Sequence, residues 1–141
     1  MKHDGGALAA ALWMGLLLGV CFYAAPIKFT AEGVGLEELL AVGKVTFQGF
    51  TWVEFGMFAL LCLTSLKVLN KKIRSLLVIL LLMLIVQKFM ILPVLDKALD
   101  QTVAGTPTHK GGLHWLYAVM DGTKVILLFV MYLFQRQSHH A

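Results

Sequence analysis

Four charged side chains lie inside long apolar runs of this sequence, where charge is uncommon. They are two acids and two bases: Glu54, Asp121, Lys88 and Lys124. Ionisable groups held away from water can relay protons, bind a polar substrate or hold a lipid head group, and at such positions they are candidate functional sites. Equal numbers of each sign also allow a structural interpretation, in which buried ion pairs only fix how helices pack. The sequence leaves both interpretations open.

The last apolar run carries a stripe of polar residues. Its members follow one another at spacings of three, four and three, and they therefore share one face of a helix: His114, Tyr117, Asp121 and Lys124. Asp121 with His114 allows acid–base catalysis, although nothing in the sequence marks a nucleophile. We therefore favour a non-catalytic protein over an enzyme.

Histidine and cysteine are not arranged as a metal or haem site. Bis-histidine haem needs a second histidine facing His114 at a similar depth, and the other four histidines lie in a loop or near the chain ends. Cys21 and Cys62 lie far apart in apolar runs and form no C-x-x-C pair. We predict no metal site and leave the cofactor unassigned.

Composition indicates which elements must position these side chains. Of 141 residues, 59% are hydrophobic and 14% are charged, and the mean hydropathy is +0.80. Soluble domains carry about 25% charged residues. Four apolar runs have the ~20 residues that cross a bilayer as a helix. We predict one all-α integral membrane domain, 1–141, that forms a four-transmembrane-helix bundle, with spans at about 6–29, 45–66, 75–95 and 113–134.

The first run begins like a secretory signal, because Met1 and Lys2 precede an apolar stretch. Cleavage by signal peptidase requires small residues, but Tyr23 stands in the A-x-A-like position and Pro26 follows closely. We therefore expect an uncleaved span.

Two polar stretches separate the spans. Residues 30–44 include Leu36, Leu39 and Leu40 at helical spacing, so part of this stretch is expected to lie as a helix on the membrane surface. Residues 96–112 contain helix-breaking glycines and Pro107, and are expected to form a loop.

Counting along the spans places the charged groups at similar depths. At 1.5 Å per residue, Glu54 lies ~13 Å and Asp121 ~12 Å from the start of their spans, while Lys88 lies ~10 Å from the end of its own. Lys124 lies about one turn deeper. We predict one interior cluster of Glu54, Lys88 and Asp121 in the outer half of the bilayer, with Lys124 completing the charge balance.

Basic residues crowd the loop between the second and third spans: Lys67, Lys71, Lys72 and Arg74. Cytoplasmic loops carry such clusters, so both termini are predicted to lie on the cytoplasmic side of the cell membrane. The same cluster explains much of the net charge of +4 without nucleic acid, because aromatic residues do not interleave with it.

Small residues form a ridge along the first span: Ala7, Ala11, Gly15 and Gly19, four residues apart. Such ridges let two helices approach closely in lipid. The partner is either another helix of the same bundle or another chain. Besides the lipid bilayer, we therefore expect a homo-oligomer or a larger membrane complex.

A longer pattern includes two of these glycines and closes the first span: Gly15-x-x-x-Gly19-x-x-Phe22-x-x-x-Pro26-x-x-Phe29. Two further features accompany it: Pro93, which is expected to end the third span, and Leu113-His114 at the start of the fourth. Together they resemble the small four-span membrane proteins of the DUF4149 or transmembrane-protein-205-like group. The resemblance implies a helical bundle over nearly the whole chain, and it implies no particular reaction.

Three functions fit these features. We favour a non-catalytic accessory or assembly subunit of a membrane complex, acting through its small-residue ridge. The alternatives are an oligomeric small-molecule or proton-linked transporter that uses the charged cluster, and a quinone-binding or enzymatic subunit that uses His114, Tyr117 and Asp121. A closed, dry cluster favours the first function, and a funnel that opens outward favours the others.

Overall fold

The computed structural model describes residues 5–66, 69–105 and 111–137, whose regular structure is all helical. Four helical rods are long and apolar enough to cross a membrane, as predicted. Pro107 and His109, expected in a loop, lie outside the described residues. In chain order the elements are α1 (Gly5–Leu17), the π-helical η1 (Leu18–Ala24), α2 (Ala25–Ile27), the 3-10 turn η2 (Lys28–Thr30), α3 (Leu36–Ser65), α4 (Lys71–Val86), the π-helical η4 (Gln87–Ile91), α5 (Leu92–Val103) and α6 (Gly111–Gln137).

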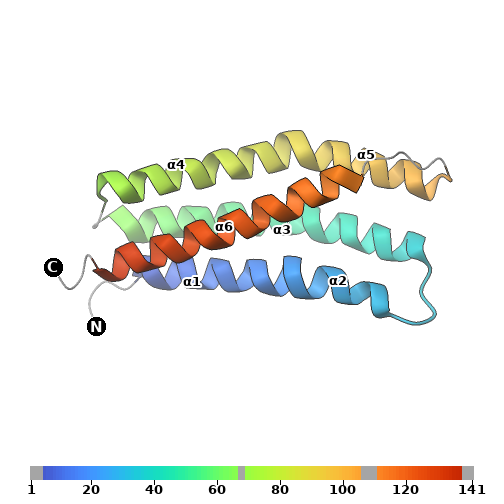
Figure 1. Cartoon of the computed structure of the whole chain (residues 1–141), viewed down its shortest axis with the longest axis horizontal. Coiled ribbons are helices and arrows are strands. Elements are labelled where there is room, and N and C mark those ends of the chain that lie inside the picture. The colour runs from blue at the N-terminus through green and yellow to red at the C-terminus, as the bar shows by residue number, and fades with distance from the viewer. Residues whose placement is uncertain (1–4, 67–68, 106–110, 138–141) are drawn as a thin grey trace.

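The four rods lie along one axis, and both ends of the described chain lie at the same end of the bundle (Figure 1). The end of α3 and the start of α4 lie there too. The last rod, α6, crosses the others obliquely and begins short of the far end. At that far end, the rod ending in η2, the start of α3 and the end of α5 therefore extend beyond α6.

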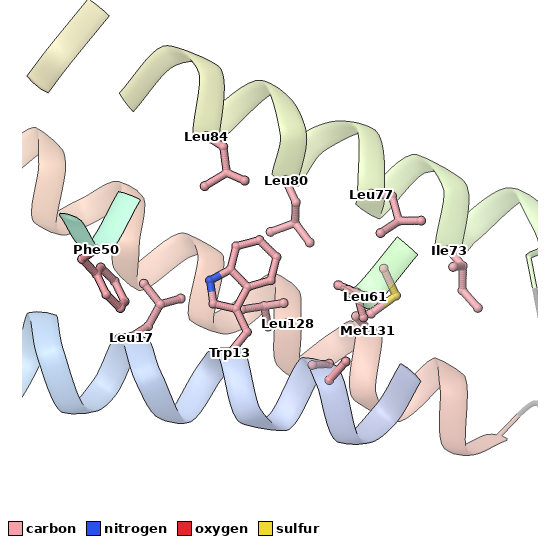
Figure 2. Close-up of a cluster of buried hydrophobic side chains, with 12 residues drawn as sticks. Trp13, Leu17, Phe50, Leu61, Ile73, Leu77, Leu80, Leu84, Leu128 and Met131 are labelled. Atoms are coloured by element: carbon pink, nitrogen blue, oxygen red, sulfur yellow. The ribbon is translucent and has the colours of Figure 1, made fainter. Parts of the chain in front are cut away.

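The apolar core fills the end of the bundle near the termini, with Trp13 at its centre (Figure 2). The buried residues of α4 recur at spacings of four and three residues, which is the period of one helix face. Close packing of these side chains holds the rods together. The largest fully buried apolar residues are Trp13, Leu17, Leu61, Ile73, Leu80, Leu84, Leu128 and Met131.

Two rods change to a π-helix just before a proline. The π-helical η1 precedes Pro26, and η4 precedes Pro93. Proline lacks an N–H and clashes with the carbonyl four residues earlier, and a wider π turn absorbs that misfit within a continuous helix. Pro93 therefore does not end the third rod, which continues to Val103.

The second rod also begins earlier than predicted. Residues 36–44 do not form a separate surface helix, because α3 runs unbroken for 30 residues from Leu36. Glu37 and Glu38 in its first turn favour this start, since acidic groups stabilise a helix N-terminus. Two polar contacts then join the extensions of α3 and α5: Lys44 to Asp100 at 2.7 Å and Gln48 to Asp96 at 2.6 Å.

Candidate functional site

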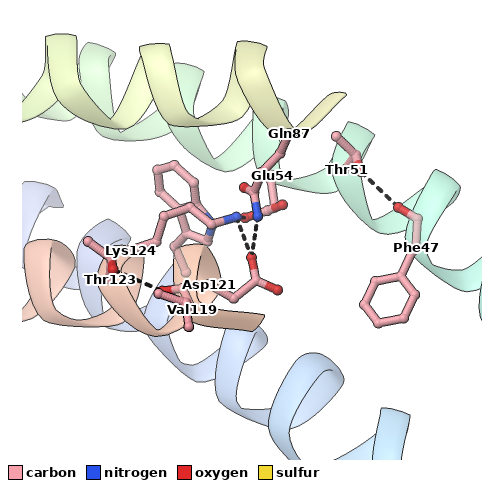
Figure 3. Close-up of polar contacts among 9 residues, drawn as sticks. Phe47, Thr51, Glu54, Gln87, Val119, Asp121, Thr123 and Lys124 are labelled. Carbon is pink, nitrogen blue, oxygen red and sulfur yellow. Dashed lines mark hydrogen bonds and ion pairs between the residues drawn. The ribbon is translucent and has the colours of Figure 1, made fainter. Parts of the chain in front are cut away.

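A buried ion cluster joins α3 to α6 in the middle of the bundle (Figure 3). The Lys124 ammonium contacts Glu54 Oε1 and lies 2.9 Å from Asp121 Oδ1. Each of the three residues is no more than 1% exposed. The sequence placed all three in one cluster, but gave Lys124 a secondary part; in the structure it is the central cation.

The other two rods each add a hydrogen bond to this cluster. From α1, Trp13 Nε1 donates to Glu54 Oε1 at 3.4 Å, and from η4, Gln87 Nε2 donates to Asp121 Oδ1 at 2.9 Å. Every rod thus contributes at least one polar group to the same point. Hydrogen bonds strengthen one another where the local dielectric is low, so the network fixes how the four rods meet.

Lys88 lies outside the cluster, and its predicted place there is wrong. Its Nζ lies 4.9 Å from the ring centroid of Trp52, a residue that is 65% exposed. Successive residues of an α-helix point about 100° apart. Gln87 continues the buried face of Leu84, and Lys88, one residue later, is turned away from it.

This arrangement changes the charge of the site. Within the described residues the cluster holds two carboxylates and one ammonium, whereas the sequence predicted two of each. In their ordinary ionisation the groups carry one surplus negative charge. A net charge out of reach of water is costly unless another group offsets it.

A cavity of about 610 Å³ reaches this cluster from the far end of the bundle. It lies between the η1–α2–η2 segment and the start of α6, with α3 and α5 as its other walls. Most of the lining is apolar. Its polar and aromatic residues include Cys21, Phe22, Phe47, His114, Tyr117 and Asp121.

Tyr117 lines the cavity and has an unsatisfied hydroxyl. The residue is 3% exposed, and among the described residues its Oη has no partner in hydrogen-bond geometry. The neighbouring Thr51 hydroxyl donates to the Phe47 carbonyl at 2.8 Å, and the Phe47 ring packs edge-on against Tyr117 at 5.4 Å. Leaving a buried hydroxyl unpaired costs about 1–3 kcal/mol. A bound molecule would remove that cost.

The polar stripe predicted on the last span divides into two parts. His114, Tyr117 and Asp121 line the cavity, with His114 exposed at the start of α6. Lys124 does not line it, and holds Asp121 from one turn further along. The first three residues of the stripe therefore form part of the cavity wall, and the last one pairs with Asp121 behind it.

Lys28, which the sequence did not single out, also lines the cavity. Its side chain crosses from η2 to α3, where a Cβ on Gly43 would collide with Lys28 Nζ. None of the ion pairs among the described residues includes Lys28. Its position two residues after Pro26, at the end of a span, was the available signal, but such lysines usually only reach for the membrane surface.

The small-residue ridge winds around the first rod, so that only part of it lies on the packed face of α1. Ala7 is buried and Ala11 half-buried, whereas Gly15 and Gly19 are exposed, with no atom within 4 Å of where a Cβ would stand. Residues four apart advance by about 40° beyond one full turn. The ridge therefore packs inside the bundle at one end only and faces outward at the other.

Comparison of the chain with protein-family models, curated proteins and solved structures found no match. The features of the molecule that bear on its function are the cavity, the ion cluster at its end and the outer surface of the rods.

Proposed function

We propose that this protein is an integral membrane protein that binds a small, largely apolar molecule in the cavity between α2 and α6. The observation that carries this proposal is the position of the ion cluster, because Asp121 and the free Tyr117 hydroxyl form the inner end of an apolar cavity. Ligand sites typically enclose 300–1,000 Å³ with few, well-placed polar groups. This feature favours the transporter and quinone-binding alternatives over a purely structural subunit.

The outer surface of the rods supports insertion into a bilayer. Large apolar side chains from all four rods point outward, and a water-facing surface would leave them without cover. Their exposed fractions reach 73%. One example from each rod is Leu8, Leu63, Leu82 and Ile126.

Basic residues support an orientation with both termini in the cytoplasm. Lys71, Lys72 and Arg74 lie in the first turn of α4, at the end of the bundle that holds both ends of the described chain (Figure 1). Lys67 belongs to the same loop but lies outside the described residues. By the positive-inside rule, this end faces the cytoplasm and the cavity lies in the outer half of the bilayer.

Cysteine labelling tests this orientation. Leu69→Cys and Glu32→Cys, each made after replacing Cys21 and Cys62 with alanine, place one thiol at an exposed site at each end of the bundle. In intact cells a membrane-impermeant maleimide should label position 32, and it should label position 69 only after permeabilisation. Labelling of position 69 in intact cells would contradict the proposed orientation.

Filling the cavity should prevent ligand binding. Ala118 is a small, half-buried residue of α6 that lines the cavity, and Ala118→Trp would place an indole ring in that space. We expect wild-type protein purified in mild detergent to retain a small molecule in near-stoichiometric amount, and the variant to lose at least about nine-tenths of it, because few pocket contacts survive. Mass spectrometry of solvent extracts measures both.

Val119→Trp is the matched control for this experiment. Val119 is the next residue of the same helix and is 57% exposed, so the same new side chain would point away from the cavity. This variant should retain the molecule as the wild type does. Equal retention by Ala118→Trp and Val119→Trp would show that the molecule binds elsewhere and would remove the proposed function.

Assembly with another membrane protein is a second candidate function. The exposed backbone at Gly15 and Gly19 leaves room for a helix to approach closely. Neither glycine lines the cavity. A protein whose role is assembly alone should therefore keep that role in the Ala118→Trp variant.

A further inference from the structure

We propose that the cavity selects a cation: an apolar molecule carrying one ammonium or similar organic cationic group, which lies against Asp121. This inference rests on the proposed function and deepens it by naming the chemical class of the ligand. Three features of the cavity's inner end carry it, namely its charge, its free acceptors and its aromatic walls.

The first feature is the surplus negative charge of the ion cluster. Glu54 and Asp121 face the single ammonium of Lys124, and Lys88 lies against Trp52 instead. A cationic ligand beside Asp121 would bring the total charge of the site to zero. An anionic ligand would raise the surplus to two negative charges, at a cost that grows as the dielectric falls.

The second feature is the set of acceptors that remain free. The Lys124 ammonium and the Gln87 amide both contact Oδ1 of the Asp121 carboxylate. Its second oxygen contacts none of the residues drawn in Figure 3, the Cys21 thiol on the cavity wall lies beside the same carboxylate, and a carboxylate can accept further hydrogen bonds. The Tyr117 hydroxyl, which also lines the cavity, has no partner. A carboxylate oxygen and a phenolic oxygen can both accept from an ammonium N–H.

The third feature is the aromatic wall next to these acceptors. Phe22, Phe47 and Tyr117 all line the cavity, and the last two pack edge-on against each other. The faces of aromatic rings attract organic cations, and sites that recognise quaternary ammonium groups are commonly built from such rings. The wall thus suits an alkylated cation as well as a simple amine.

Lys28 determines which end of the cavity receives the cation. It lies seven residues after Cys21, roughly 10 Å along the helix. Lys28 is half-buried, whereas Asp121 is 1% exposed, so water screens the lysine more than it screens the carboxylate. A bound cation should therefore lie at the Asp121 end, with its apolar body toward Lys28 and His114.

Two ions of nearly equal size and shape but opposite charge provide the test. Tetraphenylphosphonium and tetraphenylborate would be titrated separately into the purified full chain in mild detergent, with binding measured by calorimetry. We expect the cation to bind at least about tenfold more tightly than the anion, as expected for a buried charge contact. Protein-free micelles give the background for each ion.

Three variants locate the contact. Asp121→Asn removes the charge and should weaken tetraphenylphosphonium binding by about tenfold or more. Tyr117→Phe removes only the unpaired hydroxyl and leaves the ion cluster intact; because this probe has no N–H, it should change tetraphenylphosphonium binding little but weaken binding of a primary alkylammonium by about three- to tenfold. Lys88→Gln, outside the cluster, should leave both affinities unchanged.

Clear outcomes would overturn the assignment. Equal binding of the two tetraphenyl ions would mean that the surplus charge is offset within the protein, and absence of tetraphenylphosphonium binding would exclude a cation site. If Asp121→Asn fails to fold, an unchanged alkylammonium affinity in Tyr117→Phe still overturns it. Should the co-purified molecule depend on Ala118 while no cation is preferred, the cavity proposal stands and only the ligand class is wrong.

Discussion

Replacing Lys124 with methionine is expected to lower the free energy of unfolding by about 3–5 kcal/mol, the usual cost of removing one partner from a buried ion pair. Lys124 is fully buried between Glu54 and Asp121. Methionine nearly matches its length but leaves two buried carboxylates without a cation. Titration with a denaturing detergent in mixed micelles, followed by circular dichroism, measures the change.

Lys88→Met is the matched control for this prediction. The Lys88 ammonium lies over the exposed ring of Trp52 and takes part in none of the ion pairs among the described residues. A cation–π contact of that kind contributes about 0.5–1 kcal/mol. Lys124→Met is therefore expected to lower the free energy of unfolding much more than Lys88→Met does. The reverse order would restore Lys88 to the cluster and would contradict the described site.

Removing all the charges together should recover part of the loss. In the triple variant Lys124→Met, Glu54→Gln, Asp121→Asn, no buried charge is left unpaired, and buried ion pairs can often be replaced by neutral groups at little cost. A triple variant less stable than Lys124→Met alone would mean that the carboxylates stabilise the bundle without their cation.

The four rods could be predicted from the sequence because long apolar runs with few charges have one stable form in lipid, the helix. Their ends could not. Hydropathy marks the part that lipid accepts, but a helix continues as long as no residue breaks it. Residues 36–44 and 96–103 are polar enough to read as loops, yet they extend α3 and α5 and are joined by the Lys44–Asp100 ion pair.

Part of the ion cluster could be predicted from the depth of each residue along its span. The error came from ignoring the direction in which each side chain points around its helix. Counting from the span ends correctly brought Glu54 and Asp121 to one level, and it brought Lys88 there too. The buried residues Leu80 and Leu84 on the same helix, with spacings of four and three, put Gln87 on the inner face instead. Depth and helical phase, taken together, predict Gln87 and not Lys88 as the member of the cluster from this helix.

The cavity could not be predicted from the sequence. It lies between the η1–α2–η2 segment and the start of α6, and α6 crosses the other rods obliquely (Figure 1). The angle at which two helices cross depends on how their side chains interlock. The sequence of one helix alone does not determine that angle. Cys21 and Lys28 therefore read as an ordinary apolar residue and a span-end lysine until α6 is placed opposite them.

Trp13→Ala is expected to be as damaging as the loss of Lys124, lowering the free energy of unfolding by about 3–5 kcal/mol. Trp13 is fully buried in the core, packs edge-on against Phe58 at 6.4 Å and donates to Glu54. Alanine would leave a cavity at the centre of Figure 2 and remove a hydrogen bond from the ion cluster. Circular dichroism in mixed micelles measures the loss.

Two further variants separate packing from hydrogen bonding at this position. Trp13→Phe keeps an aromatic ring but removes the donor to Glu54, and should cost about 1–3 kcal/mol. Trp115→Ala removes a tryptophan that is 73% exposed and should change stability by less than about 0.5 kcal/mol. If Trp13→Phe were as harmful as Trp13→Ala, the indole would act mainly through Glu54; if both were harmless, α1 would not be packed as described. The expected order of stability losses follows from the double role of Trp13, which packs in the apolar core and donates a hydrogen bond to the ion cluster. Disturbing either the core or the cluster should therefore weaken the other through this side chain.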